Sequence, residues 1–87
     1  MALLHFPKCS VREVAVVQGG AVTMALRNLD PDTTQFDSWF VAIDEARREM
    51  LAICLVAMTS GLAVDAFVQS LDPNAVIERL GLLRVYA

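Results

Sequence analysis

Cysteine and histidine are scarce in this sequence, which excludes two kinds of small scaffold. The chain has two cysteines, Cys9 and Cys54, and one histidine, His5. A disulfide-stabilised domain of this length usually carries four or more cysteines, and a structural zinc site needs four cysteine or histidine ligands. We therefore expect no disulfide framework and no metal, with both thiols reduced in a cytoplasmic protein. A thiol redox sensor that uses Cys9 and Cys54 is an alternative.

Glycine, proline and charged residues are also few. Only 4 glycines and 3 prolines occur among 87 residues, and 20% of the residues are charged, which excludes a collagenous, low-complexity or disordered chain. The apolar share is 56%, above the roughly 45–50% of ordinary soluble domains. A chain this short buries only about 60% of the surface that it exposes when unfolded. We expect a single small domain over residues 1–87 with more apolar surface than it can cover alone.

Positive charge is too sparse for nucleic-acid binding. Seven basic residues face ten acidic ones, and the net charge is −3. Arg47 and Arg48 are the only adjacent basic pair, and Asp44, Glu45 and Glu49 surround them. Proteins that bind nucleic acid normally carry a basic patch that supplies most of the affinity. We therefore expect no nucleic-acid partner.

No arrangement of residues predicts catalysis. His5 lies near Cys9 and Ser10 in the sequence, but the sequence offers no third group to orient a nucleophile and its base. We expect no catalytic residue, no cofactor and no enzymatic activity. Residues 1–6 lack the basic region that opens a secretory signal peptide, which also favours the cytoplasm.

The segment Val11–Leu26 has signals for both a strand pair and a helix. Ser10 and Glu13 match a helix-starting capping box, whereas Gly19 and Gly20 would cost a helix about 2 kcal/mol. We favour an antiparallel hairpin whose loop is residues 18–20, which places Val16 opposite Val22 and Val14 opposite Met24. A helix over residues 11–26 remains the alternative.

Helical spacing dominates the rest of the chain. Apolar residues recur every three or four positions from Thr33 to Ser60, and Asp-Pro pairs at residues 30–31 and 72–73 are typical of helix starts. We predict one long helix over 33–60 and short helices over 62–71 and 73–80, with residues 82–86 or 3–6 able to add a strand. The expected fold class is α+β, an N-terminal hairpin packed on these three helices; an all-α bundle is the alternative.

The run from Met50 to Val64 carries no charge, and its central residues point to every side of a helix. A helix that is apolar all round must be covered all round. We therefore predict a homodimer or partner interface formed by Leu51, Leu55, Val56, Met58, Val64, Phe67 and Val68. A membrane anchor over residues 50–71 is the alternative, although Asp65 interrupts it before the roughly 20 residues that a span requires.

Three aromatic residues are possible anchors for a protein partner, namely Phe36, Trp39 and Phe40. Tryptophan is enriched at the centres of protein interfaces, but the position of these residues on the apolar stripe favours a role in the core. Taken together, the sequence predicts a small acidic interaction protein, a homodimer that acts as an adaptor, chaperone or inhibitor by covering an apolar surface of a protein partner. Acidic residues at the rim, Asp37, Asp44 and Glu45, would orient that partner.

Overall fold

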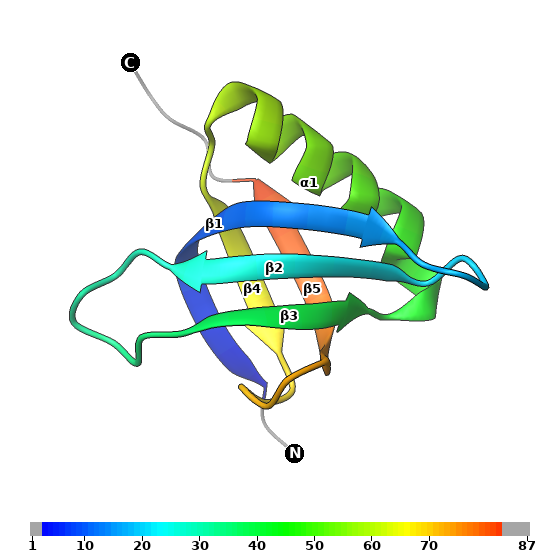
Figure 1. The fold of residues 1–87 in the computed structure, drawn as a ribbon. Coiled ribbons are helices and arrows are strands. Elements are labelled where there is room, and N and C mark those ends of the chain that lie inside the picture. The colour runs from blue at the N-terminus through cyan, green and yellow to red at the C-terminus, as the bar shows by residue number, and fades with distance from the viewer. Residues whose placement is uncertain (1–2, 83–87) are drawn as a thin grey trace.

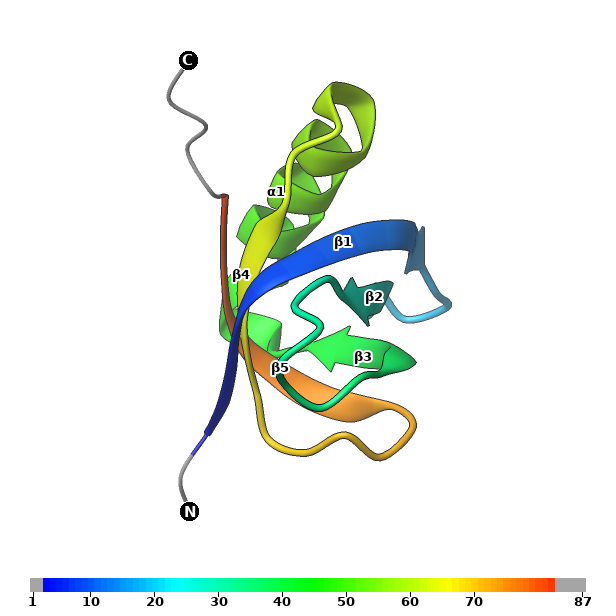
Figure 2. The same ribbon diagram turned by 90° about the vertical axis from the view of Figure 1, so that its left-hand side faces the viewer.

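The computed structural model describes residues 3–82 and shows a β-barrel with one helix packed across its end (Figures 1 and 2). The described chain contains five strands, a short 3₁₀ turn and one α-helix. In order these are β1 (Leu4–Val16), β2 (Val22–Asn28), β3 (Asp37–Ala42), the turn η1 (Asp44–Ala46), α1 (Arg47–Ser60), β4 (Val64–Val68) and β5 (Ala75–Leu82).

The strands close in the order β1-β2-β3-β5-β4, and β4 pairs back to β1. All neighbouring pairs are antiparallel except β3 and β5, which are parallel. The long strand β1 bends so that its first half pairs with β4 and its second half with β2 (Figure 1). A five-stranded Greek-key barrel with its helix between the third and fourth strands has the arrangement of an OB fold, which by itself does not reveal a function.

The hairpin prediction for residues 11–26 is confirmed. Val14 pairs with Met24 and Val16 pairs with Val22. The amide of Val17 still donates to the carbonyl of Ala21 at 2.8 Å, so residues 18–20 form the loop. Gly19 and Gly20 have φ angles of 92° and 86°, a left-handed backbone that glycine adopts without the steric cost that a Cβ atom imposes.

The predicted long helix is wrong in its first half. Only Arg47–Ser60 is α-helical, whereas residues 33–36 form a loop and Asp37–Ala42 forms β3. In β3 the inward-facing residues are Phe40 and Ala42, while Asp37 and Trp39 are exposed. This two-residue alternation, together with pairing of β3 between β2 and β5, overrides the three- and four-residue spacing of the same aromatic residues.

The two predicted short helices are also wrong, and with them the α+β layout and the all-α alternative. Residues 62–71 contain strand β4, and residues 73–80 contain a turn followed by six of the eight residues of strand β5. The second Asp-Pro pair starts a turn: the amide of Ala75 donates to the carbonyl of Asp72 at 3.1 Å, and Asn74 has a φ angle of 63°. Proline followed by a left-handed asparagine is typical of a type II turn.

The additional strand predicted from residues 3–6 or 82–86 also needs correction. Leu4–Phe6 is the start of β1 itself and pairs with β4. Strand β5 ends at Leu82 and pairs with β3 and β4. Residues 83–86 lie outside the described part of the chain.

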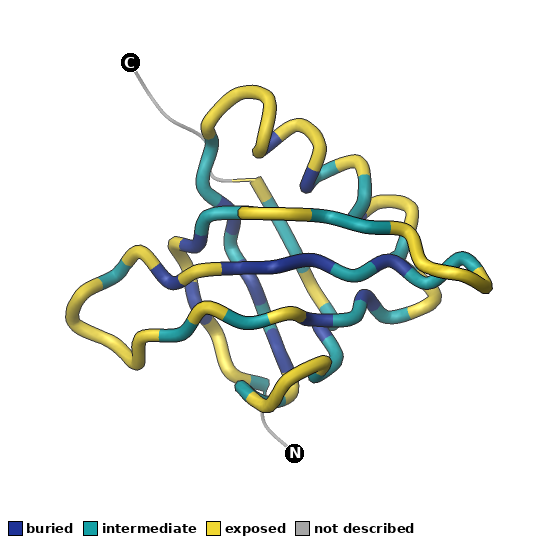
Figure 3. The backbone as a smooth tube through the Cα atoms, viewed as in Figure 1, coloured by how far each residue is buried: buried dark blue, intermediate teal, exposed yellow. Residues whose placement is uncertain are grey.

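The core fills the barrel, and α1 closes one end of it. The helix contributes Met50, Cys54 and Ala57, which are spaced to lie on one face and are buried. Its opposite face is exposed, as the tube coloured by burial shows (Figure 3). Fully buried residues inside the barrel include Met24, Leu26, Phe40, Val64, Val68 and Ile77.

Candidate functional site: the exposed side of α1 and its neighbouring groove

The helix α1 presents an apolar surface to solvent. Leu55 is 52% exposed, and Val56 and Met58 are each 44% exposed. We call the exposed residues on this side the α1 outer face, which comprises Arg48, Glu49, Ala52, Leu55, Val56, Met58, Thr59 and Ser60. An isolated exposed leucine is ordinary, but a contiguous apolar patch on a small domain marks a contact surface.

A groove of about 360 Å³ runs between the C-terminal end of α1 and β1. Its lining includes Lys8, Ser10, Val11, Leu29, Met58 and Leu62. Met58 belongs to both the groove and the α1 outer face, so the two surfaces are continuous. Lys8 is the charged residue of the lining. We call this site the α1–β1 groove.

The helix ends at the groove because of Gly61. This residue has a φ angle of 66°, and its amide donates to the carbonyl of Ala57. The amide of Leu62 donates to the same carbonyl at 3.0 Å. A left-handed glycine after the last turn turns the backbone away from the helix axis, which brings Leu62 beside Met58 in the groove lining.

The structure divides the seven residues of the predicted interface among three environments. Leu55, Val56 and Met58 are on the surface, and Leu51 is partly buried against the core. Val64 and Val68 are fully buried inside the barrel, where no partner can reach them. Phe67 faces outward on β4 and is covered by His5.

The predicted anchors are divided in the same way. Phe40 is fully buried, and Phe36 packs edge-to-face against Phe6 and Phe40, with ring centroids 4.7 and 5.7 Å apart. Only Trp39 is exposed, at 38%. Phe36 and Phe40 therefore belong to the core, and Trp39 is the one anchor candidate of the three that a partner could contact.

Trp39 lies on the outer surface of the sheet formed by β1, β2 and β3. It pairs with Ala25, and the neighbouring pair on the same face is Arg27 with Asp37. Asp37 also forms an ion pair with Arg12 of β1. The hydrogen bond and positive charge of Arg12, with a further contribution from Arg27, lower the pKa of Asp37. The charges around Trp39 are therefore largely paired with one another.

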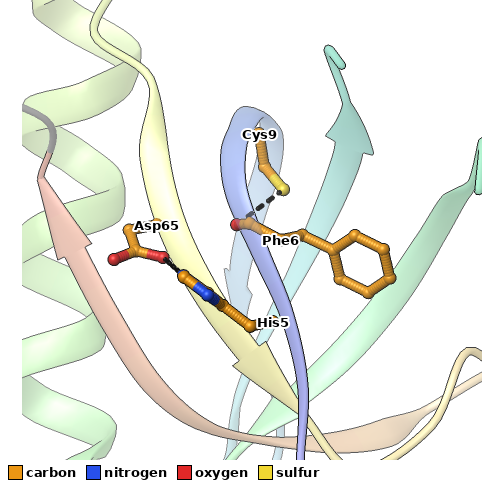
Figure 4. Close-up of polar contacts among 4 residues, drawn as sticks. All are labelled: His5, Phe6, Cys9 and Asp65. Atoms are coloured by element: carbon orange, nitrogen blue, oxygen red, sulfur yellow. Dashed lines mark hydrogen bonds and ion pairs between the residues drawn. The ribbon is translucent and has the colours of Figure 1, made fainter. Parts of the chain in front are cut away.

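A second cluster of charged and aromatic side chains lies on the outside of β1, β4 and β5, and Figure 4 shows two of its members, His5 and Asp65. The Nε2 atom of His5 contacts the Oδ1 atom of Asp65, and the imidazole stacks on Phe67 with ring centroids 4.1 Å apart. The guanidinium of Arg79 lies 5.9 Å from the centre of the Phe67 ring. These contacts join three strands on one face of the barrel.

Cys9 does not join this cluster as a nucleophile. The pairing of β1 with β4 shifts register between Phe6 and Cys9, so Cys9 is buried inside the barrel while His5 is exposed. The Sγ atom of Cys9 points toward the carbonyl oxygen of Phe6 at 3.7 Å (Figure 4). Burial, with a smaller contribution from the charge of Asp65, raises the pKa of the Cys9 thiol to about 11.

Cys54 is equally unsuited to thiol chemistry. It is fully buried on α1, and burial raises the pKa of its thiol to about 11. Reactive cysteines are partly exposed and have lowered pKa values, because the thiolate is the nucleophile. The geometry of both thiols therefore argues against a redox sensor.

The segment proposed as a membrane anchor, residues 50–71, is divided among α1, a turn and β4. Within residues 3–82, no helix is both long enough and apolar enough to span a bilayer. The same part of the chain brings together no group of three or more potential metal ligands among its histidine, cysteine and acidic residues.

Sequence reasoning missed most of the α1–β1 groove. Lys8, Val11, Leu29 and Leu62 come from four separate segments, and no local pattern links them. The one available signal was Leu29, an apolar residue directly before the Asp-Pro pair of an exposed loop. Compared with protein-family models, with curated proteins and with solved structures, the chain matches none, and its function is inferred from these surfaces alone.

Proposed function

We propose that this chain is a cytoplasmic protein-binding module that covers an apolar surface segment of a partner protein, as an adaptor, chaperone or inhibitor does. The observation that carries the proposal is the continuity of the α1 outer face with the α1–β1 groove through Met58. A convex apolar helix beside a concave apolar groove can receive a projecting side chain and surround it.

The groove favours a particular kind of side chain. Val11, Leu29, Met58 and Leu62 supply apolar walls, and Lys8 supplies a positive charge. A bulky aliphatic or aromatic side chain would fill the groove and release water from these walls. An aspartate or glutamate near it in the partner would pair with Lys8 and orient the partner.

The acidic rim proposed from the sequence is only partly retained. Asp44 and Glu45 are exposed in the turn before α1, where their negative charge would steer positively charged partners. Asp37 lies on the sheet surface and is paired with Arg12. We therefore assign the orienting role to Lys8 first, and to Asp44 and Glu45 second.

A cytoplasmic location and the lack of a nucleic-acid partner remain part of the proposal. Two buried, unpaired thiols suit a reducing compartment. Arg12 is paired with Asp37 and Arg27 lies opposite the same carboxylate, so the basic residues near Trp39 offer little free charge to phosphates. The His5–Asp65 pair lies on the outside of the barrel, whereas the thiol of Cys9 lies on the opposite side of β1, so this pair cannot activate it as a nucleophile. A binding role is therefore favoured over a catalytic one.

Selection from a peptide library displayed on phage tests the proposal. Peptides enriched on the full chain should carry a bulky apolar residue within two or three positions of an acidic residue, because the groove is apolar beside Lys8. Val11→Asp should abolish their binding by placing a charge in the apolar wall. Lys8→Ala should weaken binding and reduce its salt dependence.

The control is Val17→Asp, which makes the same substitution at an exposed valine of the hairpin tip, whereas Val11 is partly buried against the core. This variant should bind the selected peptides as the unmodified chain does. Circular dichroism and thermal unfolding would verify that each variant is folded. If no peptide is enriched, or if Val11→Asp binds the enriched peptides unchanged, the groove is not a protein-binding site.

A further inference from the structure

A second groove lies where strand β3 leads toward α1 (Figure 1). It has a volume of about 330 Å³, and we call it the β3–β5 groove. Its lining residues are Val41, Ala42, Ile43, Asp44, Glu45 and Val76. None of them belongs to the α1–β1 groove or to the α1 outer face, so this is a separate surface of the molecule.

The floor of the β3–β5 groove is apolar and is held in place by the backbone. Val41 of β3 pairs directly with Val76 of β5. The next pair in the ladder, Ala42 with Ile77, is buried, so Val41 and Val76 lie on the outer face of the barrel. The amide of Ile43 donates to the carbonyl of Ile77 at 3.1 Å, which keeps Ile43 beside β5 after β3 has ended. The apolar part of the groove is therefore formed before any ligand binds.

The end of the groove at η1 carries two negative charges. Asp44 and Glu45 are exposed, and among the described residues neither carboxylate forms an ion pair. The guanidinium of Arg47 lies at the hairpin loop instead, where a Cβ atom added to Gly20 would be 3.5 Å from its Nη1 atom. Residues 44–49 contain three acidic and two basic side chains, so the negative charge at this end of the groove is not cancelled locally.

We propose that the β3–β5 groove binds a lysine or arginine side chain from a basic segment of a partner protein. The methylene groups of that side chain would lie on Val41 and Val76, and its charged end would contact the carboxylates of Asp44 and Glu45. Lysine and arginine can cover apolar surface with their stems while the charged end stays accessible, so one side chain is complementary to both parts of the groove. This inference goes beyond the proposed function, because it adds a second site whose charge is opposite to that of Lys8 in the α1–β1 groove.

The lining of the groove distinguishes this ligand from other candidates. A purely apolar side chain would cover the valines but would draw water away from two carboxylates without supplying a counter-charge. An acidic segment would be repelled by the same carboxylates. A metal ion also fits poorly, because calcium takes about six to eight oxygen ligands and the described residues contain no group of three or more potential metal ligands.

Trp39 extends this surface beyond the groove. It lies two residues before Val41 on the same face of β3 and is 38% exposed. Alternate residues of an extended chain are roughly 7 Å apart, so an extended partner segment could place one side chain in the groove and the next but one over the indole. Tryptophan is enriched among the residues that dominate binding. The preferred segment therefore has a lysine or arginine and, two positions away, an apolar residue.

NMR titration of the isotope-labelled full chain tests the site with two pentapeptides whose ends are blocked. The probe has the sequence glycine-lysine-glycine-leucine-glycine. The control peptide replaces its lysine with norleucine, which keeps the aliphatic stem and lacks the charge. The probe should shift the backbone amides of Val41, Ile43 and Val76, and the norleucine peptide should bind about fivefold more weakly.

Variants without the two charges identify the contact. Asp44→Asn/Glu45→Gln keeps the shape of the lining and should weaken the binding of the lysine peptide about fivefold, to the level of the norleucine peptide. The matched control is Glu13→Gln/Asp32→Asn, which removes the same number of charges at exposed positions outside the groove and should leave the affinity within about twofold. Val41→Thr should weaken the binding of both peptides, because it places a hydroxyl group in the apolar floor.

Three results would overturn the proposal: groove amides that do not shift at several millimolar peptide, equal affinity for the lysine and norleucine peptides, or an equal loss of affinity in the two double variants. The last result would assign the attraction to the net negative charge of the chain. Circular dichroism and thermal unfolding verify that each variant is folded. Val11→Asp should bind the lysine peptide as the unmodified chain does, because Val11 lines only the α1–β1 groove, so the failure of one site can be told from the failure of the other.

Discussion

The Sγ atom of Cys54 lies 3.7 Å from the Sδ atom of Met24, and both side chains are fully buried. Cys54 is on α1 and Met24 is on β2, so this contact joins the helix to the inside of the barrel. Sulfur atoms are polarisable and pack closely in irregular spaces. The contact marks the place where the buried side of α1 closes the core and, as a consequence, fixes which side of the helix faces solvent.

Met24→Ala should lower the free energy of unfolding by about 2–5 kcal/mol, because a fully buried side chain is lost and a cavity remains. Met58→Ala is the matched control, since Met58 is 44% exposed and its loss should change stability by no more than about 0.5 kcal/mol. Urea unfolding monitored by circular dichroism measures both. Equal effects of the two substitutions would contradict the observed burial.

Asn28→Ala should destabilise the chain by about 1–3 kcal/mol, because a buried amide loses several partners at once. Its Nδ2 atom donates to the hydroxyl of Thr33 and the carbonyl of Thr34, both at 2.7 Å, and its Oδ1 atom accepts from the amide of Asp30 at 3.0 Å. Thr33→Val removes only one of these bonds and should cost less. Hydrogen exchange of the backbone amides in residues 29–36 should be faster in Asn28→Ala than in Thr33→Val.

The carboxyl group of Asp37 should titrate below its ordinary pKa, because Arg12 donates a hydrogen bond to it and both Arg12 and Arg27 favour its charged form. Arg12→Gln should raise that pKa toward the ordinary value, and Arg27→Gln should raise it less. Carboxyl carbon shifts followed by NMR measure the titration. The associated stability is present above the ordinary pKa of aspartate and is lost as the pH falls through the lowered value.

The stability of the chain should fall as the pH rises from 9 to 11 because of its two thiols. Burial raises the pKa of Cys9 and of Cys54 from 9.0 to about 11. Between these values the folded thiols keep protons that the unfolded thiols have lost, so unfolding becomes more favourable with pH. Urea unfolding at pH 8 and pH 10.5 measures the decrease.

The control for this alkaline prediction is the Cys9→Ala/Cys54→Ala double variant. It retains the lysine and arginine residues and should show a smaller decrease in stability over the same range. A decrease of equal size in both chains would assign the effect to groups other than the thiols. At pH 8, the thiols of the native chain should also react slowly with a disulfide reagent and quickly in denaturant.

The sequence predictions were accurate where one local signal outweighed the competing ones. The hairpin register was predictable because Gly19 and Gly20 fix a local loop, and the second half of the long helix was predictable because residues 47–60 end at a glycine cap. Strands β3, β4 and β5 were missed because their apolar residues also fit the three- and four-residue spacing of a helix. Two of the pairings that hold them, β1 with β4 and β3 with β5, join segments remote in sequence, although β2 with β3 and β4 with β5 are neighbours along the chain. Val64, Ala66 and Val68 point inward at every second position along β4, but the prediction placed these residues in a helix over 62–71.

The predictions of candidate site residues also succeeded only where the signal was local. Leu55 and Met58 were predicted because an uncharged helix segment is visible in the sequence itself. Val64 and Val68 were misplaced because periodicity indicates that a residue is covered without identifying what covers it. Lys8 and Leu29 could not be found, because they join Met58 only when β1 bends around the barrel.

The double pairing of β1 has a consequence for how the protein is made. Its first half needs β4, whose paired residues come 55–64 positions later in the chain, and β3 needs β5, whose last residue is Leu82. A ribosome releases the chain from the N-terminus, so the hairpin of β1 and β2 emerges long before the strands that complete the barrel. Such long-range pairings form slowly, and the apolar inner side of this hairpin stays uncovered until β4 and β5 have been synthesised.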